Sequence, residues 1–424
     1  MKKAKVISGI LLIVTLLSVV ISATSCSLID SSPKADDDST GSRDVIDQTV
    51  VNNEITINSD GVDELAFASA SALRSAVSVY CSFTATYAGS FWNPTPQTQT
   101  YYSTGSGVIY KLEADGSAFV ITNYHVVYDS QSNTENGISD KIYVYLYGLE
   151  ADEYAIPAKY VGGSASFDIA VLRIDDSDIL SSAMESGAAA PITVANSDSL
   201  SPGQTTIVIG NPATTELNGL SVTRGIVSVE SEYLTMNAII GSGQVTFRVI
   251  RTDAPINSGN SGGGMFNSDG ELIGIVNAKI NSTSIENIGY AIPSNVAIAI
   301  AQNIIDNCYG KECKTVMRAL LGVTTASGKR STSYDTETGK LIRTAEIVIQ
   351  EVSSGALVDG SLKKGDVVIG LKIGETSYEI SKDYHLSDAM LNAREGDTVI
   401  ITVRRGGEQL SFTFSITEAS LNAY

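Results

Sequence analysis

Short apolar and β-branched runs, separated by clusters of Gly, Asn, Asp and Ser, cover the chain from about residue 75 to residue 284. Runs of this length with turn-forming residues between them are typical of strands in an all-β barrel or sandwich. The pattern predicts strands at 77–83, 107–110, 118–122, 141–146, 169–174, 206–209, 222–229, 245–250 and 272–278. About 210 residues are enough for two small barrels packed together.

A helix is expected directly after this region. Ser294 or Asn295 can cap it, and Val296, Ile300 and Ile304 form an apolar stripe at helical spacing before the segment ends near residue 308. From about residue 315 to residue 417, strand-like runs at 346–352, 366–371, 398–404 and 410–416 surround a helical segment at 381–393. We therefore expect a mainly β protein, with an all-β barrel or sandwich and its following helix over 71–308 and a small α+β domain over 315–420.

The first 25 residues have the pattern of a secretion signal, because three lysines precede an apolar run at 6–21 and small residues lead to Cys26. The run is short compared with the roughly 20 residues of a membrane-spanning helix. The stretch ATSC at 23–26 resembles a bacterial lipoprotein signal, in which the cysteine becomes lipidated. Lipidation of Cys26, an uncleaved anchor and plain secretion all stay open. The first two predict an extracytoplasmic protein tethered to the cell membrane.

Residues 26–70 are rich in Ser, Asp, Asn and Thr, which predicts a flexible polar linker. Cys308 and Cys313 could form a local disulfide outside the cytoplasm, and the sequence leaves this pairing open. Cys81 lies in an apolar strand, which predicts a buried free thiol.

Composition excludes some classes of function. The chain has 28 basic and 47 acidic residues and a net charge of −19, whereas a nucleic-acid partner needs a basic face. Four cysteines without zinc-ligand spacing and only two histidines argue against a metal site. A phosphate-binding glycine loop followed by Lys is also missing. We expect neither a metal nor a cofactor.

The run NSGNSGG at 257–263 is the most informative stretch for chemistry. A serine hydroxyl is a poor nucleophile, so a catalytic serine needs a base and hydrogen-bond donors for an oxyanion. Glycines on both sides of Ser261 allow a tight turn that exposes its side chain and lets backbone N–H groups converge. Taken alone, the run fits a catalytic serine and a plain glycine-rich loop equally well.

The base should be one of the two histidines. His125 directly follows a predicted strand, although a lone histidine there is more often a buried structural residue. His385 lies in the C-terminal domain on a helix expected to be exposed, so we interpret it as structural. Asp168 begins an apolar strand, where a buried carboxylate needs a partner that an imidazolium would supply. An exposed aspartate at the start of the strand is the alternative.

The order His125, Asp168, Ser261 resembles that of the chymotrypsin-like serine proteases. More narrowly, the chain resembles the HtrA/Deg family, which are secreted or membrane-tethered proteases with a C-terminal PDZ domain. The matching stretches run in order: GSGVI at 105–109, TNYHVV at 122–127, DIAVL at 168–172, VIGNP at 208–212, TRGIVS at 223–228, TDAPINSGNSGG at 252–263 and GYAIPS at 289–294.

The resemblance implies a chymotrypsin-like double β-barrel and assigns roles to the matching residues. Ser261 would attack the scissile carbonyl, His125 would transfer the proton, and Asp168 would orient the imidazole. The backbone N–H groups of Gly259 and Ser261 would form the oxyanion hole. These roles are expectations that the structure has to meet.

In such proteases the base of the specificity pocket lies six residues before the nucleophile, which here is the uncharged Pro255. We expect substrate to pair as a strand near 275–278, so that Ile275 and Ala278 also line the pocket. This predicts cleavage after small or medium apolar residues, which unfolded proteins expose.

The run LLGV at 320–323 (Leu320, Leu321, Gly322 and Val323) resembles a PDZ carboxylate-binding loop, and GAL at 355–357, GSLKKGDVV at 360–368 and GDTV at 396–399 match the same domain. Peptide C-termini are the implied ligands. A plain strand start is the alternative, and KIG at 372–374 departs from the frequent VNG, which leaves the ligand preference open.

The family is usually trimeric, so the resemblance implies a homotrimer. The insertion at 85–102, which holds Phe91, Trp92, Tyr101 and Tyr102, is the candidate for a subunit or regulatory contact, and packing on its own barrel is the alternative. Together these expectations describe a membrane-tethered extracytoplasmic serine endopeptidase that degrades unfolded or misfolded proteins. The alternative is a proteolytically weak chaperone or peptide-binding scaffold.

Overall fold

The computed structural model describes residues 63–88, 95–212, 219–280, 288–312 and 316–423. The signal segment at 1–25, Cys26, Cys313 and the tip of the 85–102 insertion lie outside these residues. None of the helices in the described ranges combines the length and apolar character needed to span a bilayer.

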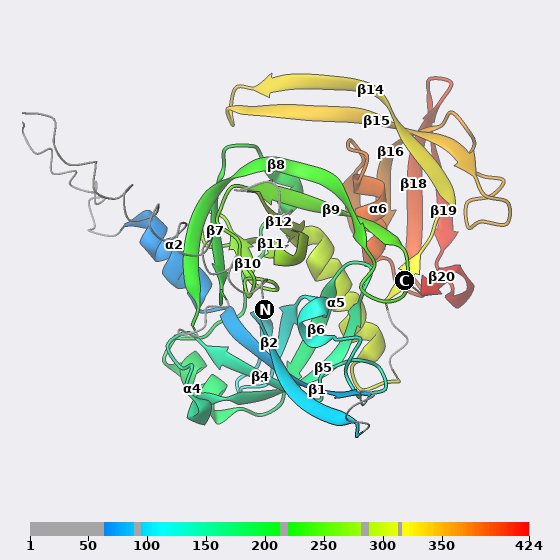
Figure 1. Cartoon of the computed structure of the whole chain (residues 1–424). Helices are drawn as coiled ribbons and strands as arrows, with labels where there is room; N and C mark the ends of the chain where they lie inside the picture. The colour runs from blue at the N-terminus through cyan, green and yellow to red at the C-terminus, as the bar shows by residue number, and fades with distance from the viewer. Residues whose placement is uncertain (1–62, 89–94, 213–218, 281–287, 313–315, 424) are drawn as a thin grey trace, which may run out of the picture. The chain divides into compact units, whose positions relative to one another are not determined.

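Two closed six-stranded antiparallel barrels form the first part of the described chain (Figure 1). The first has the order β1-β2-β3-β6-β5-β4, with bounds Ala76–Tyr87, Gln97–Leu112, Ala118–Thr122, Ile169–Ile174, Ile156–Ser164 and Lys141–Leu146. The second has the order β10-β11-β12-β9-β8-β7, with bounds Gly264–Phe266, Leu272–Val276, Gly289–Pro293, Gln244–Thr252, Ser221–Asn237 and Thr205–Gly210. The expected double barrel is confirmed.

Helices and 3₁₀ turns connect and flank the strands of the barrels. The helices are α2 (Glu64–Leu73), α3 (Tyr124–Val127), α4 (Asp178–Glu185) and α5 (Ser294–Cys308). The 3₁₀ turns are η1 (Asp152–Tyr154), η2 (Ser197–Ser199) and η3 (Ala278–Ile280). The predicted helix after residue 293 is thus α5, and the apolar stripe of Val296, Ile300 and Ile304 is buried as expected.

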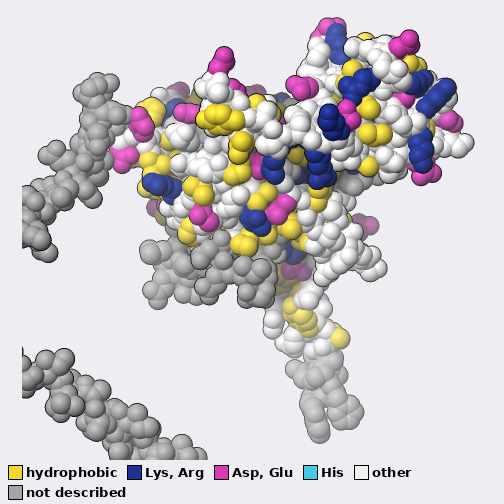
Figure 2. Space-filling model, turned by 90° about the horizontal axis from the view of Figure 1, so that it is seen from above, with side chains coloured by type: hydrophobic (Ala, Val, Ile, Leu, Met, Phe, Trp, Pro, Cys, Tyr) yellow, Lys and Arg dark blue, Asp and Glu magenta, His cyan; other side chains and the backbone are white. Residues whose placement is uncertain are grey.

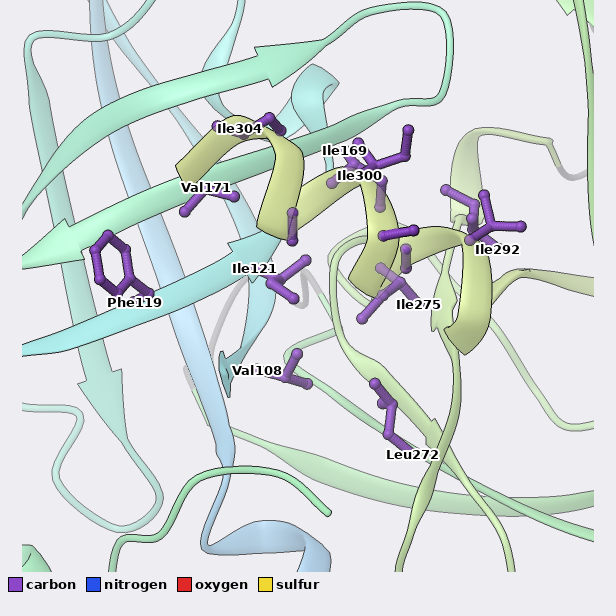
Figure 3. Packing of buried hydrophobic residues seen from close by; sticks show 14 of the residues in the cluster. Val108, Phe119, Ile121, Ile169, Val171, Leu272, Ile275, Ile292, Ile300 and Ile304 are labelled. Atoms are coloured by element: carbon purple, nitrogen blue, oxygen red, sulfur yellow. The ribbon is translucent and has the colours of Figure 1, made fainter. Parts of the chain in front are cut away.

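One apolar core joins side chains of both barrels to α5. Ile121 and Ile169 of the first barrel and Ile275 and Ile292 of the second belong to the same buried cluster as Ile300 of α5 (Figure 3). Dense packing of this kind resists movement. This shared core therefore holds the strands of the two barrels and α5 in contact.

The first helix begins earlier, and the β1–β2 hairpin extends further, than the sequence pattern predicts. Helix α2 starts at Glu64, inside the predicted linker, because Ala68 and Ala72 bury one small face against the core. Strand β1 pairs with β2 out to Tyr87 and Gln97, so both ends of the 85–102 insertion extend this hairpin. Tyr101 stacks on Phe83 of the same barrel.

The C-terminal domain has its own buried core and a sheet of order β14-β15-β16-β18-β19, with β17 paired to β16. These strands are Val323–Asp335, Lys340–Val352, Val367–Ile373, Thr398–Arg405, Glu408–Ser415 and, for β17, Thr376–Glu379. The remaining elements are β13 (Met317–Ala319), which pairs with β20 (Leu421–Ala423), and α6 (His385–Ala389), η4 (Met390–Asn392) and η5 (Glu418–Ser420). The helical segment is shorter than predicted.

Candidate active site

Asp168 lies directly before β6 and is only 1% exposed. Its φ of 53° is in the left-handed region, which aspartate tolerates better than most residues with a side chain. Oδ1 accepts a hydrogen bond from the backbone N–H of His125 at 3.0 Å, and Oδ2 lies 2.7 Å from Nδ1 of the same residue. The amide of Asn123 donates to the Asp168 carbonyl at 2.8 Å. The structure therefore brings His125 and Asp168 together.

His125 lies on α3, a single helical turn that directly follows β3. A carboxylate can only accept a hydrogen bond, so the contact with Asp168 places the imidazole proton on Nδ1. The lone pair of Nε2 then remains available to accept a proton. This is the tautomer that a general base beside a serine requires.

Ser261 lies in the serine loop, the name used here for residues 257–263 between β9 and β10. Its Oγ accepts a hydrogen bond from the backbone N–H of Ala278 at 3.1 Å. Among the contacts of the described residues, none joins this oxygen to His125. Oγ and Nε2 of His125 must therefore come within hydrogen-bond distance before the histidine can take the serine proton.

Asn277 connects the acid to the serine and was missed by the sequence reasoning. Its fully buried side chain donates from Nδ2 to Oδ2 of Asp168 at 2.7 Å, and the next residue, Ala278, contacts Ser261. The only sequence signal was its place directly after the apolar run of β11. Two successive residues thus contact both ends of the candidate triad.

The backbone of the serine loop offers two unused donors. In the described part of the chain, neither the N–H of Gly259 nor that of Ser261 has an acceptor, although both residues are buried. Other N–H groups of the loop are satisfied, since Asn260 donates to Asn257 and Gly262 donates to Val276. Buried backbone donors nearly always have partners. Two without one can therefore bind an incoming oxygen.

The three expected pocket residues have different surroundings. Ala278 lies beside Ser261, and Pro255 is exposed with its carbonyl accepting from the hydroxyl of Thr223 at 3.0 Å. Ile275 was expected to line the specificity pocket, but it is fully buried in the core shared with α5 (Figure 3) and lines no accessible pocket. The uninterrupted apolar run of β11 could not indicate which residues face outward.

The LLGV run of the C-terminal domain ends at Val323, the first residue of the edge strand β14. Gly322 has a φ of 72°, and a Cβ there would approach the Cβ of Ala356 to 2.3 Å, so glycine is required. The Gly322 carbonyl accepts from the N–H of Ser353 at 2.8 Å. Leu320 is exposed, whereas Leu321 is buried and Val323 begins the strand.

His385 and Cys81 are buried to different degrees, and Cys308 forms a disulfide. The Nδ1 atom of His385 contacts the Glu379 carbonyl at 2.9 Å, and burial lowers the pKa of this imidazole. The side chain is thus partly buried, in contrast to the expected exposed position. Cys81 is a buried free thiol, as predicted, and burial raises its pKa to about 12. Cys308 is disulfide-bonded.

The chain is similar to known serine proteases in sequence and in fold. Residues 105–275, which include His125, Asp168 and Ser261, match the trypsin-like peptidase domain. The Do-like serine protease HtrA of Bacillus subtilis (strain 168) is 33% identical over 318 residues, which are 74% of this chain and 63% of that protein, so the chain spans less than two thirds of this relative. The Do-like HtrA of Lactococcus lactis subsp. lactis (strain IL1403) is 34% identical over 315 residues, 72% of this chain and 68% of that protein.

A solved structure of the HtrA-type protease AlgW with a decapeptide has a TM-score of 0.50 and 28% identity, and the match covers 86% of this chain and 100% of that one. The resemblance read from the motifs is therefore confirmed by similarity over most of the chain. Together with the double barrel, these matches show that the chain belongs to the Do-like HtrA family of serine proteases.

Proposed function

We propose that the protein is a serine endopeptidase with Ser261 as nucleophile, His125 as general base and Asp168 as the orienting acid. The observation that carries the proposal is the 2.7 Å contact between His125 and the buried Asp168, which Asn277 and Ala278 link to Ser261. A histidine held in this tautomer by a buried acid is the arrangement that activates a serine.

The geometry supports the following steps. Ser261 Oγ leaves the Ala278 N–H, gives its proton to Nε2 of His125 and attacks the peptide carbonyl. Asp168 then faces an imidazolium and stabilises its charge, while the free N–H groups of Gly259 and Ser261 bind the oxyanion. His125 returns the proton to the leaving amine, and water repeats the sequence to release the acyl group. Removing one oxyanion donor typically lowers kcat by about 10²–10³.

A fluorophosphonate probe tests this proposal, because it labels only an activated serine. We expect covalent labelling at Ser261 and cleavage of unfolded casein by the intact protein, and neither by Ser261→Ala. Thermal unfolding of the variant should match that of the parent. A folded parent that is not labelled would indicate the peptide-binding scaffold, and casein cleavage by Ser261→Ala would overturn the assignment.

The substrate is proposed to be unfolded polypeptide, cleaved after small or medium apolar residues. The uncharged Pro255 at the predicted pocket base and the small Ala278 beside Ser261 support this preference, because neither can pair with a basic side chain. Cleavage of a denatured protein followed by mass spectrometry of the new C-termini measures it. Products ending mainly in Arg or Lys would contradict it.

The C-terminal domain is proposed to be a PDZ domain that binds peptide C-termini. Its first strand, β14, is a sheet edge to which a peptide can add as a strand. Within the described chain, the N–H groups of Leu321 and Gly322 have no acceptor, so they can hold a terminal carboxylate. A peptide with an apolar free C-terminus should bind, and its C-terminally amidated form should not. Equal binding of both would refute the carboxylate site.

We also propose an extracytoplasmic homotrimer that is tethered to the cell membrane through Cys26. The support for the tether is the apolar run at 6–21 and the lipoprotein-like residues before Cys26. The proposed trimer rests on the resemblance to the HtrA/Deg family. In a bacterial host, the parent should fractionate with membranes and Cys26→Ala should lose the lipid-dependent mass increase. Light scattering of the purified protein should give three times the chain mass. A monomer would contradict the trimer.

A further inference from the structure

Ser106 lies in β2 of the first barrel, is fully buried, and contacts the serine loop in two places. Its backbone N–H donates to the Ser261 carbonyl at 2.8 Å, and its hydroxyl donates to the Gly259 carbonyl at 2.8 Å. The same hydroxyl oxygen accepts from the backbone N–H of Asn211 at 2.7 Å. The side chain of Thr122 donates to the Ser106 carbonyl at 2.7 Å. Every polar atom of Ser106 is therefore engaged.

We propose that Ser106 is a positioning residue for the oxyanion hole, an inference that rests on the proposed peptidase function. Gly259 carries one of the two free N–H groups, and its φ of 94° is one of several conformations open to glycine. The peptide between Gly259 and Asn260 is held at both ends: Ser106 Oγ binds its carbonyl, and Asn257 accepts from its N–H at 3.0 Å. Contacts from outside the loop must fix this conformation, because glycine by itself does not.

Close packing around Ser106 supports this role. A Cβ on Gly262 would lie 2.1 Å from the Ser106 carbonyl oxygen, and a Cβ on Gly210 would lie 3.0 Å from Ser106 Oγ. The serine loop and the end of β7 can therefore approach Ser106 only because both positions are glycine. This close approach lets a strand of the first barrel hold a loop of the second.

The neighbouring strand provides a matched control. Ser78 of β1 pairs directly with Ser106, and it is also fully buried. Its Oγ has no hydrogen-bond partner in the part of the chain that the structure describes. Removing either hydroxyl deletes the same atom from the same sheet, but only the one on Ser106 contacts the serine loop.

The experiment compares Ser106→Ala, Ser106→Cys and Ser78→Ala with the parent, using kcat and KM for a peptide substrate. It also measures inhibition by a peptide aldehyde, which forms an oxyanion on Ser261. We expect Ser106→Ala to lower kcat by roughly 10–100-fold, less than the loss of a direct donor, with KM within about twofold. Aldehyde affinity should fall in parallel. Ser106→Cys keeps a weak donor and should be intermediate, and Ser78→Ala should match the parent.

The outcomes separate this inference from the proposed function. A parent that neither cleaves substrate nor reacts with the fluorophosphonate overturns the function. An active parent with equal kcat for Ser106→Ala and Ser78→Ala overturns the role of Ser106, as does a change confined to KM. If Ser106→Ala does not fold, Ser106→Cys decides: parental kcat and aldehyde affinity reject the role, and a parallel loss of both supports it.

Discussion

A buried charge needs partners, and Asp168 has them on both carboxylate oxygens. His125 donates to it twice, and Asn277 donates to Oδ2 at 2.7 Å. With Asn277 in place, Oδ2 has a second donor that restricts the rotation of the carboxylate. The side chain of Asn277 therefore affects the orientation of the imidazole through Asp168.

We predict that Asn277→Ala lowers kcat by about 10-fold or more with little change in KM. The reason is that a hydrogen bond to a charged group contributes roughly 1.5–3 kcal/mol, and here its loss loosens the acid that orients His125. Initial-rate kinetics on a peptide substrate measure the effect.

Asn303 on α5 is the matched control, because it is similarly buried but its side chain hydrogen-bonds to the backbone of Met317 and to the Asn307 amide, away from the candidate triad. Asn303→Ala should lower the melting temperature and leave kcat near the parental value. An identical loss of kcat in both variants would show that Asn277 acts only through general stability.

At the scale of the element, the conformation of the serine loop requires glycine where neighbouring atoms leave no room for a side chain. Gly262 has a φ of 85°, and its added Cβ would lie 2.1 Å from the backbone oxygen of Ser106 and 2.4 Å from the hydroxyl of Thr122. A backbone oxygen inside a barrel strand cannot move aside as the end of a flexible side chain can. A side chain at this position must therefore displace the loop.

We predict that Gly262→Ala abolishes measurable peptidase activity and lowers the melting temperature. Gly187, at the end of α4, has a similar φ of 78° but nothing within 4 Å of its added Cβ. Gly187→Ala should therefore cost only about 1–2 kcal/mol of backbone strain and leave kcat unchanged. Calorimetry and kinetics on both variants separate steric displacement from strain, and full activity in Gly262→Ala would refute the argument.

Strands with strong apolar patterns could be predicted from the sequence. Strands that form only because they pair with neighbouring strands could not. Strands β3, β4 and β6 have the predicted bounds, since their side chains are buried or alternate clearly. Strand β10 has three residues, and β14 is mostly exposed and polar. Their strand conformation comes from hydrogen bonding to neighbouring strands, which no local pattern reveals.

On the scale of the whole molecule, two features matter: the distribution of charged side chains on the surface, and a C-terminal domain that has its own core. On the face shown in Figure 2, Lys and Arg side chains lie among Asp and Glu side chains although the net charge is −19. Asp366 of the C-terminal domain is 1% exposed. It accepts hydrogen bonds from Arg405 at 2.6 and 2.7 Å and from the Lys363 N–H at 2.8 Å. Burial alone would raise the pKa of Asp366, but the hydrogen bonds from Arg405 and Lys363 hold it below its usual value.

A carboxyl group with a lowered pKa stabilises the folded state when it is ionised. Its contribution is complete above the unfolded pKa of about 3.9 and is lost as the pH falls through the lower folded value. We predict that acid below about pH 4 destabilises the C-terminal domain in part through Asp366. Asp366→Asn should lower its unfolding free energy at pH 7 by about 2 kcal/mol or more and flatten the acid dependence.

Glu346 is the matched control, because it pairs with the neighbouring Arg404 but is 36% exposed. Such surface pairs contribute about 0–1 kcal/mol, so Glu346→Gln should change little. Scanning calorimetry between pH 7 and pH 3 measures both variants. A parental acid dependence in Asp366→Asn would contradict the assignment.

By itself, the sequence determined most of the strands and the helix after them through local apolar patterning, and the order of its motifs, which resembles the HtrA/Deg family, added the double barrel and the candidate triad. Tertiary structure decided that Asn277 contacts the acid, that Ser106 reaches Gly259 and that Ile275 lies in the core. Each of these contacts joins segments far apart in the chain. Which side chains meet there depends on strand register and on the packing of the two barrels, and no local pattern encodes either.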